Sequence, residues 1–191
     1  MNFERNVTRG NIENILLNYK NSIKEIGASI GQKKGLELLT LLKREIINVE
    51  PYPTVTLFEA ANRIMTDLVI LEGIKWIFDN NIFPFEIYTI EYGNENENSH
   101  DITANNSTKN LIGEAFNVAP SFFQGKKSSA VDKLKNSTLK SDYKLLLINS
   151  DAVTSAYQPK LNEGIFHVFI NINSGIGKSF PISERQVNLK D

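Results

Sequence analysis

The sequence predicts an α/β fold with a mixed central sheet, and three observations lead to this fold class. A long apolar helix pattern is followed by three short strand patterns that polar turns separate. A second helix pattern then precedes an almost continuously apolar strand, which is typical of a central strand buried on both faces. The order helix, three strands, helix, strand differs from regular strand–helix alternation, so a Rossmann-type sheet is not expected.

Composition excludes several classes of protein. The 191 residues include no cysteine and only two histidines, which excludes thiol chemistry and multi-histidine metal sites. Lys plus Arg (21) nearly balance Asp plus Glu (22), so a polybasic protein is excluded but a local basic patch is not. The sequence shows neither an apolar leader nor a run of about 18 apolar residues, so we expect a cytoplasmic protein without a membrane span. Lysine (16) outnumbers arginine (5), which favours an AT-rich bacterial source.

Residues 1–53 are expected to form an N-terminal helical region. Apolar residues recur at helical spacing in two runs within 11–48, and Gly27 separates the runs. Pro51 and Pro53 interrupt the pattern and mark the boundary to the next region.

The core of the fold is expected in residues 54–173. Its first element is a helix at about 56–80, which Thr56 and Glu59 begin as a capping box. The β-branched residues around position 70 would also suit a strand, but the cap and the length favour a helix. The next elements are strands at 85–92, 100–104 and 111–119, a helix at 122–136 that a Ser121–Gln124 capping box opens, a strand at 143–149, one or two helical turns at 151–157 and a strand at 165–172. The tail, 174–191, is expected to be loosely ordered.

Two acidic residues on adjacent strands are the leading candidates for chemistry. Asp101 lies on the second expected strand, and Glu114 lies within the otherwise apolar third strand. A carboxylate in such surroundings is costly unless it is paired or bound to a cation. Two carboxylates and a backbone carbonyl offer the hard oxygen ligands that Mg²⁺ prefers. Alternatively, Glu114 points to solvent on an edge strand or pairs with a lysine.

The element order αβββαβ, with Asp on the second strand and Glu on the third, resembles the PD-(D/E)XK nuclease superfamily over residues 56–172. The resemblance implies a restriction endonuclease-like core in which Asp101, Glu114 and the carbonyl of Ala115 bind Mg²⁺ or Mn²⁺. It also implies hydrolysis of DNA phosphodiester bonds by an activated water. The pattern places a lysine two residues after Glu114, but this chain has Phe116 there.

A replacement for the missing lysine is expected in the helix that follows the third strand. Lys127 falls on the apolar stripe of that helix with Phe123 and Leu134, where a lysine is unexpected. Lys127 is therefore the candidate catalytic lysine, and Lys126, one position round the helix, suits contact with a phosphate. Both lysines could equally be surface residues with snorkelling side chains.

A local excess of lysine favours a nucleic-acid contact surface. Residues 126–144 hold six lysines against two aspartates, which suits backbone phosphates, although a solvated helix face shows the same pattern. The candidate DNA-binding residues are Lys126, Lys133, Lys135 and Lys160.

These residues predict a metal-dependent DNA endonuclease, with a type II restriction enzyme as one form of it. A homodimer would suit cleavage of both strands. Two alternatives stay open: an inactive nuclease-fold module that binds DNA or protein, which Phe116 favours, and an unrelated α/β binding protein. His100 is expected to be a surface residue, Glu59 is explained by its capping role, and no Ser-His-Asp arrangement is expected.

Overall fold

The computed structural model describes residues 3–93, 99–160 and 164–181. The N-terminal part contains strand β1 (Asn6–Thr8) and helices α1 (Ile12–Ser22), α2 (Ile26–Ile30) and α3 (Gly35–Arg44). The long helix α4 (Leu57–Asp79) is followed by strands β2 (Ile87–Ile90), β3 (Ile102–Asn105) and β4 (Asn110–Phe116). The last elements are helix α5 (Phe123–Lys135) and strands β5 (Tyr143–Asn149), β6 (Ile165–Ile170) and β7 (Gly177–Phe180).

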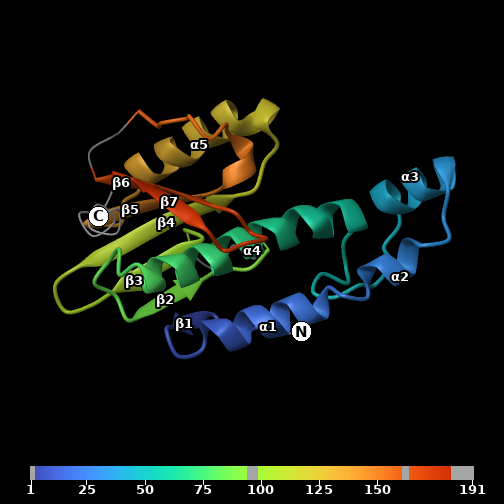
Figure 1. Ribbon diagram of the computed structural model, residues 1–191, viewed down its shortest axis with the longest axis horizontal. Coiled ribbons are helices and arrows are strands. Elements are labelled where there is room, and N and C mark those ends of the chain that lie inside the picture. Colours follow the sequence, from blue (N-terminus) through green and yellow to red (C-terminus); the bar gives the residue numbers. More distant parts are fainter. Residues whose placement is uncertain (1–2, 94–98, 161–163, 182–191) are drawn as a thin grey trace.

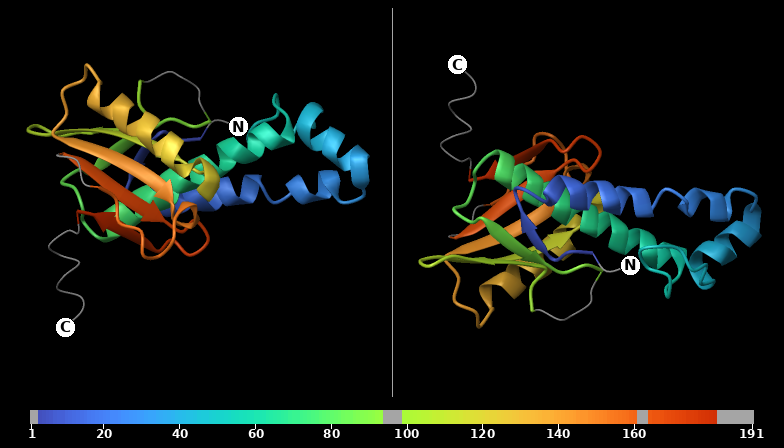
Figure 2. Two further views of the ribbon diagram at one scale, coloured as in Figure 1. Left: turned by 90° about the horizontal axis from the view of Figure 1, so that it is seen from above. Right: turned by 90° about the horizontal axis from the view of Figure 1, so that it is seen from below.

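One mixed sheet holds the molecule together. Its seven strands lie in the order β1-β2-β3-β4-β5-β6-β7, and only the β4–β5 and β5–β6 pairs are parallel. Helices α1 and α4 pack on one face and α5 packs on the other, as Figures 1 and 2 show. The α/β class and the mixed sheet are therefore confirmed, with α5 as the crossover between the parallel strands β4 and β5.

Helix α4 is the central helix of the fold, and its cap defines where it begins. Thr56 Oγ1 accepts a hydrogen bond from the backbone N–H of Glu59, at 3.3 Å. Gly73 lies against strand β5, where a Cβ atom would come within 2.7 Å of Leu147 Cδ1. Helix α4 can thus approach the sheet closely. The structure confirms the expected helix, and the β-branched segment near position 70 belongs to it.

The N-terminal region differs from the expectation. The first helix ends at Ser22, and Gly27 lies inside α2 rather than ending a helix. Strand β1 pairs with β2, so the region also contributes an edge strand to the sheet. Three residues are too few to show an alternating apolar pattern, which is why the sequence did not reveal β1. Helices α2 and α3 project beyond the sheet (Figures 1 and 2).

Two boundaries in the second half also need correction. A 3₁₀ turn at Pro120–Phe122 precedes α5, and Phe122 caps the helix without a side-chain hydrogen bond, so the Ser121 capping box does not form. The expected helical turns at 151–157 are one 3₁₀ turn at Ser150–Ala152. The expectation of a loose tail is wrong for Gly177–Phe180, which form strand β7. Pairing with β6 supplies the backbone hydrogen bonds of this strand, and its own sequence has no clear strand pattern. Residues 182–191 lie outside the described residues.

Within the described ranges, no helix combines the length and the hydropathy that a membrane span requires.

Candidate functional site

The register of β3 and β4 brings Asp101 and Glu114 opposite each other. The last pair of this ladder is Ile102 with Gly113, and Asp101 and Glu114 are the next residues in the same antiparallel register. The sequence predicted Asp101 within this strand. The residue instead lies directly before it, because β3 begins at Ile102. Its Oδ2 accepts a hydrogen bond of 2.8 Å from the backbone N–H of Ala115, which holds the side chain against β4.

Both carboxylate oxygens of Glu114 have partners. Glu114 is only 6 % exposed and lies on the sheet face that α5 covers. Its Oε2 accepts a hydrogen bond of 2.7 Å from Lys133 Nζ on α5, and its Oε1 lies 2.6 Å from His100 Nδ1. One of the alternatives expected from sequence, pairing of Glu114 with a lysine, is therefore what the structure shows.

His100 connects Glu114 to Ser137. Its Nε2 lies 2.8 Å from Ser137 Oγ, and the side chain is buried, so the expectation of a surface histidine is wrong. A neutral imidazole satisfies both contacts if Nδ1–H donates to Glu114 and the Ser137 hydroxyl donates to Nε2. The three residues have the order of a Ser-His-carboxylate triad, which was not expected. However, Lys133 neutralises the carboxylate, and neither cavity that Asp101 lines includes Ser137. We therefore interpret His100 and Ser137 as residues that orient Glu114.

The electrostatics of Asp101 show that two carboxylates share a confined space. Burial raises the pKa of Asp101 above its usual value, and the nearby charge of Glu114 raises it further. The Ala115 N–H and the ammonium groups of Lys133 and Lys126 act in the opposite direction. A cation near Asp101 would favour its charged form.

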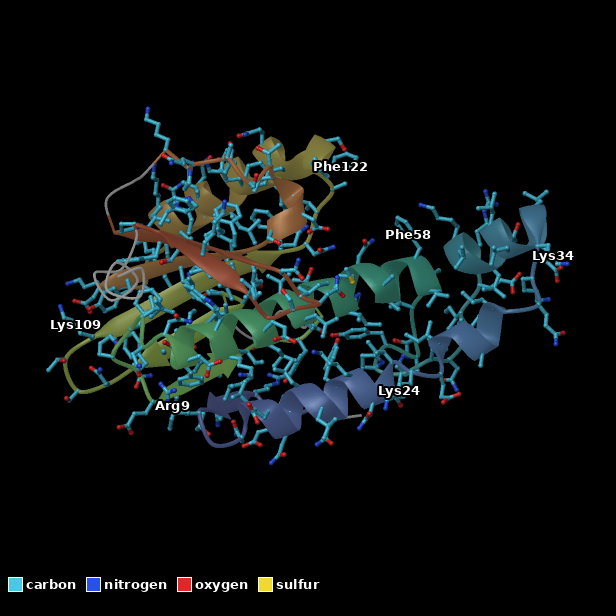
Figure 3. The ribbon with its side chains drawn as sticks, in the orientation of Figure 1. Arg9, Lys24, Lys34, Phe58, Lys109 and Phe122 are labelled. Carbon is cyan, nitrogen blue, oxygen red and sulfur yellow. The ribbon has the colours of Figure 1, made fainter. Side chains whose placement is uncertain are left out.

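Two adjoining cavities contain Asp101. The smaller, of about 190 Å³, also includes Glu114, Lys126, Ser129 and Lys133. The larger, of about 420 Å³, extends from Asp101 to the first half of α4. The residues common to both cavities are Thr66, Glu91, Asp101, Ala115, Phe116 and Lys126. The site therefore lies between the first part of α4 and α5. In Figure 3 the label Phe58 lies near the start of α4 and the label Phe122 lies near the start of α5.

The lysines of α5 fall on two sides of the helix. Lys126 and Lys133 are seven residues apart, which is about two helical turns, so they share one flank and both line the smaller cavity. Lys127 lies on the apolar stripe and donates a hydrogen bond of 3.0 Å to the hydroxyl of Tyr157. Tyr157 in turn packs against Phe169 of β6, with ring centroids 5.9 Å apart.

The structure does not bring Lys127, the expected catalytic lysine, into either cavity that contains Asp101. The centre of the apolar stripe faces the middle of the sheet, whereas Asp101 lies at the end of β3, beyond one flank of α5. Lys133, expected only to bind DNA, is the lysine that reaches Glu114. Lys135 and Lys160 are exposed and line neither of the two cavities.

The donor set of the site fits a hard divalent cation. Asp101, Glu114 and the Ala115 carbonyl would supply oxygen ligands, which Mg²⁺ and Mn²⁺ prefer. Among the described residues, no group of three or more His, Cys, Asp or Glu side chains is arranged to hold a metal ion. A metal here would thus rely on two carboxylates and on non-side-chain oxygens, and it would share Glu114 with Lys133.

Comparison with known proteins adds no relative: no family model, no curated protein and no solved structure matches this chain.

Proposed function

We propose that this chain is a divalent-metal-dependent endonuclease with a restriction endonuclease-like core, which hydrolyses DNA phosphodiester bonds. The observation that carries the proposal is the placement of Asp101 and Glu114 at one register position, in a cavity that two lysines of α5 also line. The element order from α4 to β5 and the parallel pairing of β4 with β5 support the same core.

Five residues of the smaller cavity have a part in this proposal. Asp101, Glu114 and the Ala115 carbonyl would hold Mg²⁺ or Mn²⁺, which when bound activates water and neutralises charge on the phosphate. Lys133, held 2.7 Å from Glu114, takes the role that a lysine at position 116 has in the superfamily and stabilises negative charge as it develops. Lys126, which also lines the cavity, would contact the DNA backbone beside the cleaved bond.

The test is cleavage of supercoiled plasmid in Mg²⁺ or Mn²⁺ by the parental protein and by Asp101→Asn and Glu114→Gln. Both variants should lose cleavage by about 10²–10³-fold, because each removes charge that the transition state needs. Asp79→Asn is the matched control, since Asp79 is an exposed carboxylate at the far end of α4. Parental cleavage by Glu114→Gln at an unchanged melting temperature would contradict the proposal.

The alternative of an inactive nuclease-fold module that binds DNA or protein has its own supporting observation. Phe116 fills the usual lysine position, and both Glu114 oxygens already have protein partners. This alternative predicts that duplex DNA binds in Ca²⁺ but is not cleaved in Mg²⁺ or Mn²⁺. Fluorescence anisotropy and plasmid cleavage on one protein preparation distinguish the two functions.

The homodimer and the cytoplasmic location stay predictions. Leu36 and Leu39 are the most exposed large apolar residues of α3, at 78 % and 59 %. Light scattering over a range of protein concentrations measures whether the chain associates.

A further inference from the structure

We infer that the larger cavity contains a second phosphate subsite, formed by Arg63 of α4 and Lys126 of α5, for a backbone phosphate next to the one that is cleaved. The inference rests on the proposed function and extends it to the neighbouring part of the substrate. Both residues line the same space of about 420 Å³ as Asp101, and they approach it from the two helices on opposite faces of the sheet.

The side chain of Arg63 is held in place by two contacts, but one of its hydrogen-bond donors has no partner among the described residues. Its Nη2 donates a hydrogen bond of 2.5 Å to Glu59 Oε1, and its guanidinium carbon lies 5.5 Å from the centre of the Tyr52 ring. Its Nε is buried and has no hydrogen-bond partner among the described residues. Buried donors are almost always satisfied, so Arg63 keeps a hydrogen-bonding capacity that the described residues do not use, and a phosphate oxygen would reach this N–H after a shift of the side chain. Arginine offers its donors in a planar fork that suits a phosphate.

Lys126 supplies the second positive charge of the subsite. Its side chain is exposed at the start of α5, and it lines both the larger cavity and the smaller one that contains Glu114. Lys126 is therefore common to the cavity that contains both carboxylates and to the cavity that contains Arg63, so one phosphate backbone could contact both parts.

The charge of the cavity decides which ligand fits. Four carboxylates line it, from Glu59, Asp67, Glu91 and Asp101, against two cationic side chains. A free inorganic anion is therefore disfavoured. A phosphate tethered through the nucleic-acid backbone has a high effective concentration at the subsite once its neighbour is bound. The ligand is consequently an oligonucleotide rather than free phosphate.

The experiment compares plasmid DNA with bis(p-nitrophenyl) phosphate, a substrate that has one phosphodiester and no neighbouring phosphate. Arg63→Gln should lower kcat/KM for DNA roughly 10-fold more than for the single diester, because it removes one charge-assisted phosphate contact. The salt dependence of DNA binding in Ca²⁺ should become shallower by about one contact. Arg63→Lys, which keeps the charge but not the Nε–H, should fall between the parent and Arg63→Gln.

Arg44→Gln is the matched control, because Arg44 is an exposed arginine on α3 away from both cavities. Lys126→Gln is a second test that does not depend on Arg63, and it should show the same preferential loss on DNA. Equal losses on both substrates, or an unchanged salt slope in both variants, would overturn the subsite while leaving the nuclease proposal intact. If the parental protein hydrolyses neither substrate and does not bind DNA, the subsite falls together with the proposed function.

Discussion

Glu114 and Asp67 are both buried carboxylates, at 6 % and 1 % exposed, but the protein compensates their charges differently. Glu114 is paired with a half-exposed lysine and a histidine. Asp67 accepts hydrogen bonds from the hydroxyls of Tyr19 and Tyr52, and its Oδ1 accepts a bond of 3.0 Å from the N–H of Gly93.

Under the proposed function, the difference separates a carboxylate that takes part in the reaction from a joint, a carboxylate that holds elements together. A half-exposed ammonium can exchange its carboxylate for a phosphate or a metal-bound group without unfolding the protein. Asp67 is bound by two tyrosine hydroxyls, one from α1 and one from the loop before α4. If either hydroxyl moved away, the buried charge of Asp67 would lose a hydrogen-bond donor and would not be solvated. Under the proposed function, the chemistry therefore belongs to Glu114, whereas Asp67 attaches α1 to the rest of the protein.

The largest expected effect tests the cationic partner of Glu114. Lys133→Ala should lower the single-turnover cleavage rate by about 10²–10³-fold, or roughly 3–4 kcal/mol, because it removes a donor that acts mainly in the transition state. Lys127→Ala is the control on the same helix and should cleave at nearly the parental rate, since Lys127 contacts Tyr157. A larger loss of cleavage rate in Lys127→Ala than in Lys133→Ala would instead favour Lys127 as the catalytic lysine and would contradict the role given to the Glu114–Lys133 pair.

His167 extends the comparison to a buried ionisable group that has neither an ion pair, as Glu114 has, nor hydrogen bonds from hydroxyl groups, as Asp67 has, among the described residues. It is fully buried, and neither ring nitrogen has a hydrogen-bond partner in the described chain. Burial, helped by the charge of Lys127, lowers the pKa of His167 from 6.5 to about 4. The unfolded chain therefore binds a proton below pH 6.5 that the folded chain binds only near pH 4.

Stability should consequently be fully present above pH 6.5 and fall as the pH is lowered towards 4, by at most about 3 kcal/mol from this group. Urea denaturation of the parent and of His167→Leu at several pH values measures the effect. The variant should lose less stability over this interval. The opposite trend that the raised pKa of Asp101 produces is common to both proteins and cancels in the difference. Parallel curves would show that His167 does not resist protonation in the fold.

The joint at Asp67 can be tested with two buried tyrosines. Tyr19→Phe should lower the free energy of unfolding by about 1–3 kcal/mol, because it removes a donor to a buried carboxylate. Tyr88→Phe is the matched control: Tyr88 is equally buried, but its hydroxyl has no hydrogen-bond partner among the described residues. Its loss should cost almost nothing. Equal changes in the two urea midpoints would contradict the role of Asp67 as a joint.

The smallest expected effect concerns salt. If Lys126 contacts a backbone phosphate, the slope of log affinity against log salt for duplex DNA should be shallower by roughly 0.9 in Lys126→Gln. Lys24→Gln is the control, since Lys24 lies near α2 on the projecting N-terminal part (Figure 3). Binding in Ca²⁺ that does not depend on salt would favour the protein-interaction alternative instead.

The sequence by itself determined the elements that have strong local signals. The capped α4, the apolar β5 and the strand pairing around Glu114 are all encoded in caps, periodicity and turns, which act over a few residues. The sequence also identified Asp101 and Glu114, because a carboxylate within an apolar strand is conspicuous wherever the strand lies.

Only the tertiary structure decided which flank faces the carboxylates. That choice depends on how α5 lies across the sheet, which brings Lys133 to Glu114 and Lys127 to Tyr157. The burial of His100 and its contact with Ser137 join residues 37 positions apart, and no local pattern carries such a pairing. Short strands such as β1 and β7 form because a neighbouring strand offers them hydrogen bonds, so their formation is a property of the assembled sheet.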